Sequence, residues 1–275
     1  MTESKYGKRN IVVLAIEINN LNLSDLFIFF LLLKFFYYHD VIFFQGSVQF
    51  RLPGSPFAPT CGKDSATLGK LFMRRLLQDL YVIGYDFLCS VDLSRGFDQG
   101  TLIFKKGLMS GERMKPQMIC VAPYSSDKLH LLHASEGAIF IVKDAIAAIW
   151  KPGIKSDQRS STEESLYEIK LKGNPWSGDS SDESIMARKL TIEIVGRLSL
   201  MNWRFHASVN VRNGCGNCLY FVQDERYAMT PTDFAVMSPG RWDRLRLISF
   251  DKPALEAARL TVLRFYQGQS IPSQI

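Results

Sequence analysis

The sequence predicts an α+β protein in which residues 47–275 contain two diverged copies of one unit, in the order strand, helix, four strands, helix. Three observations support this prediction. A turn of the form Gly-x-Pro-aromatic occurs twice, an amphipathic helix with the same apolar spacing follows each turn, and similar strands follow each helix. Because the matches keep one order along the chain, a repeated supersecondary unit explains them better than chance does.

Each copy is expected to open with a strand that ends in this turn. The first reads VQFRLPGSPF (Val48–Phe57), and the second reads YEIKLKGNPW (Tyr167–Trp176). Proline restricts the residue before it and so fixes the turn. Phe57 and Trp176 follow the two prolines. They either pack beneath the next helix or mark an exposed recognition point, so both are candidate ligand-binding residues.

The two predicted helices carry apolar residues at the 3.6-residue spacing of an amphipathic helix. These positions recur at one constant offset, which relates the copies to each other. They are Leu68, Phe72, Leu76, Leu77, Leu80 and Ile83 in the first helix, and Met186, Leu190, Ile194, Val195, Leu198 and Met201 in the second.

Alternating residues after each helix predict four strands, and a final helix follows them. Four consecutive strands joined by short turns are expected to form an antiparallel meander, with helices over one face and the other face solvated or used for binding. In the first copy the expected elements are Gly84–Leu93, Thr101–Lys106, Met118–Ala122, Lys128–His133 and Glu136–Trp150. In the second they are Asn202–Val211, Leu219–Asp224, Phe234–Ser238, Arg244–Ser249 and Pro253–Tyr266.

These patterns predict an N-terminal segment at 1–46, a first repeat at 47–154, a linker at 155–166 and a second repeat at 167–275. The linker is polar and rich in serine, as domain boundaries often are. The element order resembles the duplicated unit of the TATA-binding protein and, more loosely, that of helix-grip domains. The resemblance covers most of residues 47–275 and no sequence motif. It implies two copies side by side about a pseudo-twofold axis, with DNA on the curved sheet.

Residues 1–46 include an apolar zone that lies outside the repeat. A transmembrane helix at about 21–44 is one interpretation, because the zone is long enough to span a bilayer. Lys34 lies near the middle of the zone and opposes insertion. A buried or partner-bound amphipathic segment is a second interpretation. The third is non-coding sequence retained in a gene model, because the zone is low in complexity and rich in residues that AT-rich codons specify.

Composition sets broad limits on class and compartment. The 275 residues are 47% hydrophobic with a net charge of +6, values typical of a globular protein. The basic residues form no stripe or tail of the kind that a dedicated nucleic-acid surface shows. The five cysteines form no disulfide framework, and Cys89 and Cys120 in apolar runs are expected to be buried thiols. We therefore expect an intracellular protein, cytoplasmic or membrane-anchored, that faces a reducing compartment.

One candidate ligand site lies where the second strand of each copy ends. In the first copy it comprises Ser90, Asp92 and Arg95, and in the second Ser208 and Asn210. Each serine precedes its Asp or Asn by two residues and therefore lies on the same strand face. These groups could hold a cation or a phosphate. Residues that form turns at strand ends explain them equally well.

Other chemically suggestive residues have simpler interpretations. Cys215 and Cys218 form a CxxC in a glycine-rich turn, where a tight hairpin is expected, and no second ligand pair exists to close a zinc site. His130 and His133 are expected to face opposite sides of a strand, so they cannot bind one metal together. His206 is interpreted as a tolerated surface position. No cofactor and no metal are expected.

The hypothesis that follows is a non-enzymatic binding or scaffold protein, with an unidentified protein or small molecule as its partner. A nucleic-acid-binding protein that uses the sheet face is the first alternative, although the charge distribution does not favour it. An enzyme with a site in one repeat, around His206, Cys215 and Cys218, is the second. A membrane partner is conceivable only through residues 21–44.

Overall fold

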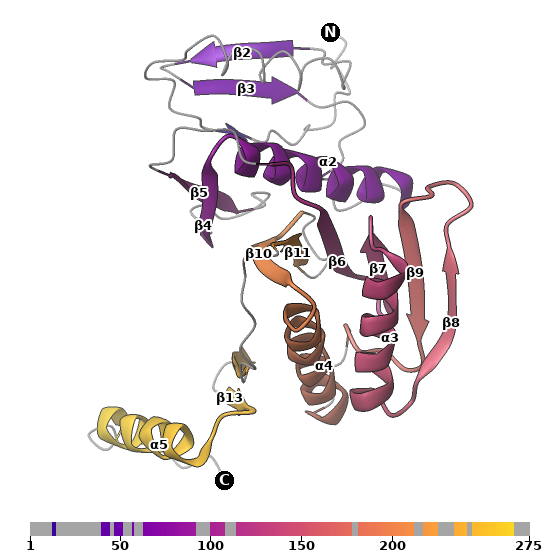
Figure 1. The fold of residues 1–275 in the computed structure, drawn as a ribbon. Coiled ribbons are helices and arrows are strands. Elements are labelled where there is room, and N and C mark those ends of the chain that lie inside the picture. Colours follow the sequence, from indigo (N-terminus) through magenta and orange to yellow (C-terminus); the bar gives the residue numbers. More distant parts are fainter. Residues whose placement is uncertain are drawn as a thin grey trace, which may run out of the picture. The chain divides into compact units, whose positions relative to one another are not determined.

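The computed structural model describes residues 13–14, 40–44, 47–51, 57, 63–91, 100–107, 114–177, 181–211, 217–224, 234–240 and 244–266. The predicted unit occurs twice, so the prediction of an α+β protein with a duplicated unit is confirmed (Figure 1). The first copy comprises β3 (Ser47–Arg51), α2 (Lys63–Val82), β4 (Tyr85–Val91), β5 (Thr101–Lys106), β6 (Met118–Tyr124), β7 (Lys128–Leu132) and α3 (Glu136–Ile149). The second comprises β9 (Leu166–Leu171), α4 (Ser181–Ser199), β10 (Trp203–Val209), β11 (Cys218–Gln223), β12 (Val236–Gly240), β13 (Arg244–Ile248) and α5 (Lys252–Tyr266).

A further strand precedes the first strand of each copy and forms a hairpin with it. β2 (Asp40–Phe44) pairs antiparallel with β3, and β8 (Ile154–Arg159) pairs antiparallel with β9. β1 (Val13–Leu14) lies on the other side of β3. β8 therefore occupies part of the segment expected to be a linker, and β2 occupies the end of the apolar zone in which a transmembrane helix was one interpretation.

The sheets differ from the meander expected from the sequence. One sheet has six strands in the order β10-β11-β6-β7-β9-β8, whereas β4-β5 and β12-β13 each form a two-stranded sheet. β6 thus has β11 rather than β5 as a neighbour, and the two pair antiparallel with Tyr220 opposite Cys120. The expectation that consecutive strands pair was wrong here. The first five residues of β6 are all buried, so both of its faces are covered.

The chain divides into two compact units that do not coincide with the two copies. The first comprises residues 1–124, 130–133 and 206–222, and the second comprises residues 125–129, 134–205 and 223–275. No finding tests the predicted repeat boundaries, which therefore remain a prediction. Each unit is described separately below.

In the first unit, α2 packs against β4 and β6. Leu76, Leu77, Met73 and Tyr81 of α2 are buried, but Leu68 from the predicted apolar stripe is exposed. Lys70 is buried instead. The stripe was therefore correct in its centre and wrong at its start, where Leu68 faces solvent and Lys70 takes an inward position.

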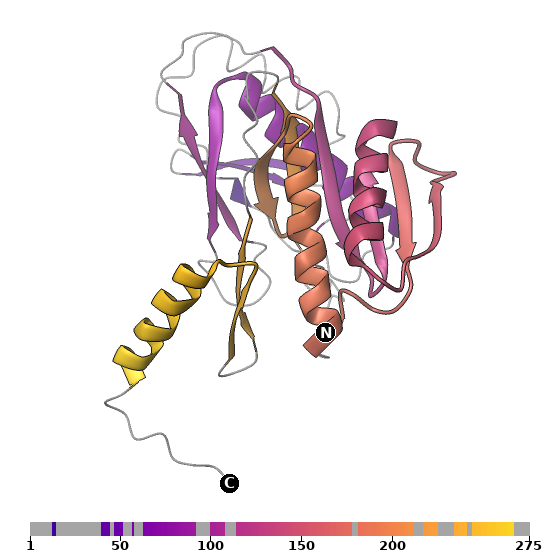
Figure 2. The same ribbon diagram turned by 60° about the horizontal axis from the view of Figure 1, so that its bottom comes forward.

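In the second unit, α3 and α4 pack against each other and run side by side in both views (Figure 2). Ser135 caps α3 by accepting a hydrogen bond from the backbone N–H of Ala138, as N-cap serines do. Its inner face buries Ala138, Ile139, Val142, Ala145 and Ile146, and α4 buries Ala187, Leu190, Ile194 and Leu198. Met201 of the predicted stripe of α4 lies past the helix end and is exposed.

Among the residues that the structure describes, no helix is long and apolar enough to cross a membrane. Most of the apolar zone at 21–44 lies outside those residues.

Candidate functional site

Polar side chains gather between α2 and the strands of the first unit. Lys70, Arg74 and Gln78 follow one another at four-residue intervals, so they line one side of the helix. Lys70 and Gln78 are buried. A helix face that packs on a sheet is usually apolar, so this polar row is the feature of the fold that most needs a chemical explanation.

Lys70 is held by an imidazole and an aromatic ring. Its Nζ atom lies 3.3 Å from Nδ1 of His130 and 4.8 Å from the ring centroid of Tyr124. The His130 and Tyr124 rings are stacked with their centroids 4.3 Å apart. The donor in the contact between Nζ and Nδ1 depends on which ring nitrogen of His130 carries the proton. The three side chains thus form one compact polar and aromatic group between α2 and the sheet.

Two thiols and a phenol line the same face of the sheet. Tyr220 lies opposite Cys120, and Cys218 is two residues from Tyr220 on β11, so all three side chains point the same way. The side chains of Cys120 and Cys218 are hydrogen-bonded, and the Tyr220 hydroxyl donates to the carbonyl oxygen of Lys70 at 3.3 Å. Burial raises the pKa of Cys120 and that of Tyr220, so both groups are neutral at physiological pH.

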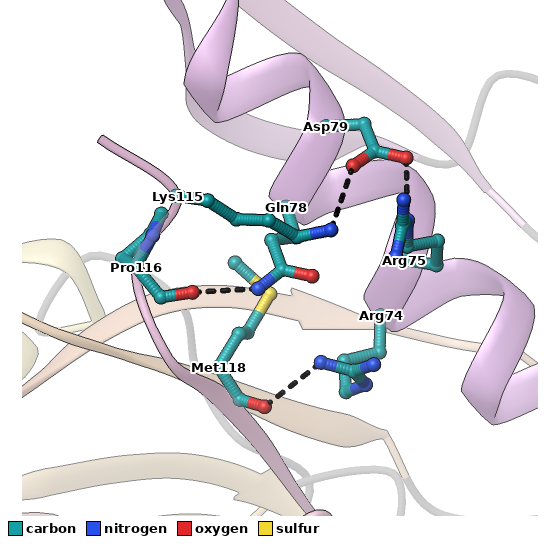
Figure 3. A network of polar contacts seen from close by, with 7 residues as sticks. All are labelled: Arg74, Arg75, Gln78, Asp79, Lys115, Pro116 and Met118. Carbon is teal, nitrogen blue, oxygen red and sulfur yellow. Dashed lines mark hydrogen bonds and ion pairs between the residues drawn. The ribbon is translucent and has the colours of Figure 1, made fainter. Parts of the chain in front are cut away.

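The C-terminal half of α2 is hydrogen-bonded to the segment that leads into β6 (Figure 3). Arg74 donates to the carbonyl oxygen of Met118 at 3.2 Å, and Gln78 donates to that of Pro116 at 2.6 Å. Asp79 accepts from Arg75 at 2.7 Å, and its other oxygen lies 3.8 Å from Nζ of Lys115. Burial lowers the pKa of Arg74. These contacts fix where the buried strand begins.

The cluster around Lys70 is closed to a substrate in this structure. His130 and Cys120 are fully buried, and Lys70 is 3% exposed. Within the described part of the chain, no three His, Cys, Asp and Glu side chains come together in a group that could hold a metal ion. The geometry therefore fits a buried polar network that sets the position of α2 on the sheet.

Sequence reasoning missed Lys70, although one signal was present. The residue at the same place in α4 is Arg188, so both copies carry a cation there. Arg188 donates from Nε to the hydroxyl of Ser238 at 2.8 Å and from Nη1 to the carbonyl oxygen of Ser184 at 2.7 Å. In each copy, the first helix thus turns a basic side chain toward strand residues of its own unit.

The predicted turn aromatics both pack against neighbouring elements. Phe57 is buried, and its ring centroid lies 6.3 Å from that of Phe72 on α2. Trp176 is half-buried and donates from its indole nitrogen to the carbonyl oxygen of Lys128 at 2.7 Å. Phe57 lies in the first unit and Trp176 in the second.

The predicted strand-end group is described only in part. Ser90 is exposed on β4, whereas Asp92 and Arg95 lie outside the described residues. Ser208 accepts a hydrogen bond from the side-chain amide of Asn217 at 3.0 Å. Asn210 is half-buried, and its Oδ1 atom has no hydrogen-bond partner among the described residues. Whether these residues bind a ligand stays a prediction.

Two predictions about single residues were wrong. Cys89, expected to be buried, is exposed, whereas Cys120 is buried as predicted. His206, expected at the surface, is buried, and its ring meets that of Tyr81 edge-on with centroids 5.6 Å apart. Alternation along a strand cannot show which face a helix covers, and α2 covers the face that carries His206. Cys215 lies outside the described residues.

A second candidate site is the surface that β12, β13 and α5 present. Met237, Leu245, Leu255 and Val262 are 63%, 49%, 41% and 46% exposed. Their counterparts in the first copy are Val121, Leu129, Ile139 and Ile146, which are at most 3% exposed. We call these four exposed residues the C-terminal apolar surface. Positions that form core in one copy are thus uncovered in the other.

Comparison with known proteins identifies a family. A family model, described only as a domain and without a functional term, matches the chain twice, over residues 39–105 and 117–226. The chain belongs to this family. The two matches are consistent with the duplicated unit, and together they cover more than half of the chain. No curated protein and no solved structure matches it.

Proposed function

We propose that this protein is a non-enzymatic binding or scaffold protein whose partner is a protein that covers the C-terminal apolar surface. What supports the proposal is the contrast between Leu255 and Ile139. The two occupy the same helix position in the two copies, yet Leu255 is 41% exposed and Ile139 is 3% exposed. Exposed apolar patches on folded proteins commonly mark interaction sites.

The surface extends beyond these positions. α5 also exposes Leu260, Leu263 and Phe265, whereas the matching helix α3 buries its inner face within the second unit, where it contacts α4. Burying a side chain of this kind stabilises by about 1.5–3 kcal/mol. Several such residues on one short helix can therefore supply the affinity of a protein interface. The closed polar cluster beneath α2 offers no comparable access to a substrate.

Site-specific photo-cross-linking in living cells tests the proposal. A photoreactive amino acid would replace Leu255 in the full chain, and in a matched control it would replace Phe140. Phe140 is also an exposed apolar residue on a helix, at 71% exposure, but it lies on α3. We expect discrete protein adducts at position 255 and none at 140. Equal labelling at both positions, or no adduct at 255, contradicts the proposal.

A further inference from the structure

Cys120 and Cys218 are buried together in the first unit, on neighbouring strands. Tyr220 of β11 lies directly opposite Cys120 of β6, and Cys218 precedes Tyr220 by two residues. Side chains two residues apart on a strand share a face, so the two thiols lie diagonally across one face of this antiparallel pair. Their side chains are hydrogen-bonded to each other. Two thiols that are far apart in the sequence thus meet inside the fold.

Packing alone does not require two thiols in contact. A buried cysteine packs as a small apolar side chain, and many apolar residues could take its place. What a contacting pair adds is the ability to form a disulfide. The pair also lies close to α2, because the hydroxyl of Tyr220 donates to the carbonyl oxygen of Lys70 on that helix.

The two thiols differ in how readily each can react. Cys218 is the first residue of β11 and follows the exposed Asn217, whereas Cys120 lies within the fully buried run of β6. A strand end opens to solvent at a lower cost than the middle of a buried strand. The hydrogen bond from Cys120 lowers the pKa of Cys218 although burial opposes it, whereas burial raises the pKa of Cys120. Because the thiolate is the reactive form, Cys218 should react first.

We propose that Cys120 and Cys218 form a reversible redox switch, which hydrogen peroxide oxidises to a disulfide and a small-molecule thiol reduces. The sulfur of Cys218 attacks a peroxide oxygen and the O–O bond breaks. Cys218 becomes a sulfenic acid, and the other oxygen leaves as water with the thiol proton. The sulfur of Cys120 then attacks that of Cys218, and the sulfenic hydroxyl leaves as a second water with the Cys120 proton. Two electrons pass from the two thiols to the peroxide, and two molecules of the reducing thiol return them.

Bond formation must draw β6 and β11 together at this point. Diagonal neighbours in a sheet are about 7–8 Å apart, whereas the Cα atoms that a disulfide joins are usually about 4.4–6.8 Å apart. The movement acts on Tyr220, which lies opposite Cys120 and bonds to Lys70. Oxidation therefore alters the contact between β11 and α2.

Peptide mapping of the oxidised full-length chain tests the switch. The reduced protein is treated with hydrogen peroxide under native conditions, its remaining thiols are alkylated, and linked peptides are identified by mass spectrometry. We expect a link between Cys120 and Cys218, removed by dithiothreitol and severalfold more abundant than any link to Cys61, Cys89 or Cys215. The same oxidation in urea is the matched control, in which this preference should disappear because the unfolded chain no longer holds the two strands together.

Single substitutions test the order of the two steps. In Cys120→Ser, the sulfenic-acid probe dimedone should label Cys218, because no thiol is left to displace the hydroxyl. In Cys218→Ser, Cys120 should remain a thiol. In the oxidised wild type, amide hydrogen exchange should change in α2 around Lys70 and stay constant in α4 around Arg188.

Three results would overturn the inference. One is a link from Cys218 to Cys215 in place of Cys120, and another is two free thiols at 120 and 218 after treatment with peroxide. The third is a Cys120–Cys218 disulfide that leaves hydrogen exchange in α2 unchanged, since the bond would then switch nothing. None of these results depends on the C-terminal apolar surface, so this proposal and the proposed function fail separately.

Discussion

The Nζ atom of Lys70 on α2 lies 3.3 Å from Nδ1 of His130 on β7, and both residues are buried. We predict that Lys70→Ala lowers the free energy of unfolding by about 2–5 kcal/mol, because it leaves a cavity in a packed interior. Lys70→Met keeps the volume and removes only the polar contact to His130, so it should cost less than Lys70→Ala. Urea unfolding followed by fluorescence measures both variants. Equal losses for Ala and Met would show that the polar contact to His130, not side-chain volume, stabilises this site.

Gly173 and Gly153 allow a test of backbone conformation in the second unit. Both have positive φ, at +82° and +80°. We predict that Gly173→Ala and Gly153→Ala each cost about 1–2 kcal/mol, because a side chain is disfavoured in this region. A Cβ atom at 173 would lie 2.8 Å from Oε1 of Glu183, whereas nothing lies within 4 Å of one at 153. Oε1 is the far end of a long side chain that can rotate away, so thermal denaturation should show only a small excess loss at 173. A much larger loss there would mean that Glu183 is fixed.

The described cysteines should differ sharply in reactivity. Cys89 is exposed, whereas Cys120 and Cys218 are buried. In a Cys61→Ser, Cys215→Ser background, we predict that an aromatic disulfide reagent labels Cys89 at once and the other two only on unfolding, because burial raises the pKa of Cys120 and blocks access. Mass spectrometry after peptide digestion assigns each label. Simultaneous labelling of all three cysteines would contradict the burial of Cys120 and Cys218.

Asp157 should add a small acid-dependent term to the stability of the second unit. Its carboxylate accepts hydrogen bonds from Tyr167 and from Lys143, the latter at 2.6 Å, and these hold the pKa of Asp157 below its ordinary 3.8. The stabilisation is therefore present above that ordinary value and is lost as the pH falls through the lower pKa of the folded state.

We expect the partly exposed carboxylate of Asp157 to contribute about 0.5 kcal/mol to the free energy of unfolding. Urea unfolding of the wild type and of Asp157→Asn, from neutral pH downward, should show a difference that shrinks as the solution becomes acidic. If the difference in the free energy of unfolding stays constant across this pH range, the carboxylate of Asp157 is not its source.

Much of the fold followed from local patterns. The recurring turn and the apolar spacing identified both copies, because each repeat must bury the same helix face and keep the same turn. The pairing of β6 with β11 did not follow, since alternation along a strand sets its faces and says nothing about its neighbour. Lys70 was missed for a related reason. A lysine is assigned to solvent unless a partner is known, and His130 lies sixty residues further along the chain.

The candidate surface was not predictable from the sequence. Leu255 and Ile139 occupy the same place in the repeat and have the same apolar character. Only their exposure distinguishes them, and exposure depends on which elements lie against each helix. The predicted groups around Asp92 and Arg95 lie outside the described residues, so the strand-end site and the nucleic-acid alternative remain predictions.

The central claim is that the second copy exposes positions that the first copy buries. The matched substitutions Ile139→Ala and Leu255→Ala test it most directly, with the free energy of unfolding measured on dilute full-length protein. We predict a loss of about 2–5 kcal/mol for Ile139→Ala and a change within about 0.5 kcal/mol for Leu255→Ala. Comparable losses at both positions would show that Leu255 is already packed within the chain, which would contradict a surface left free for a partner.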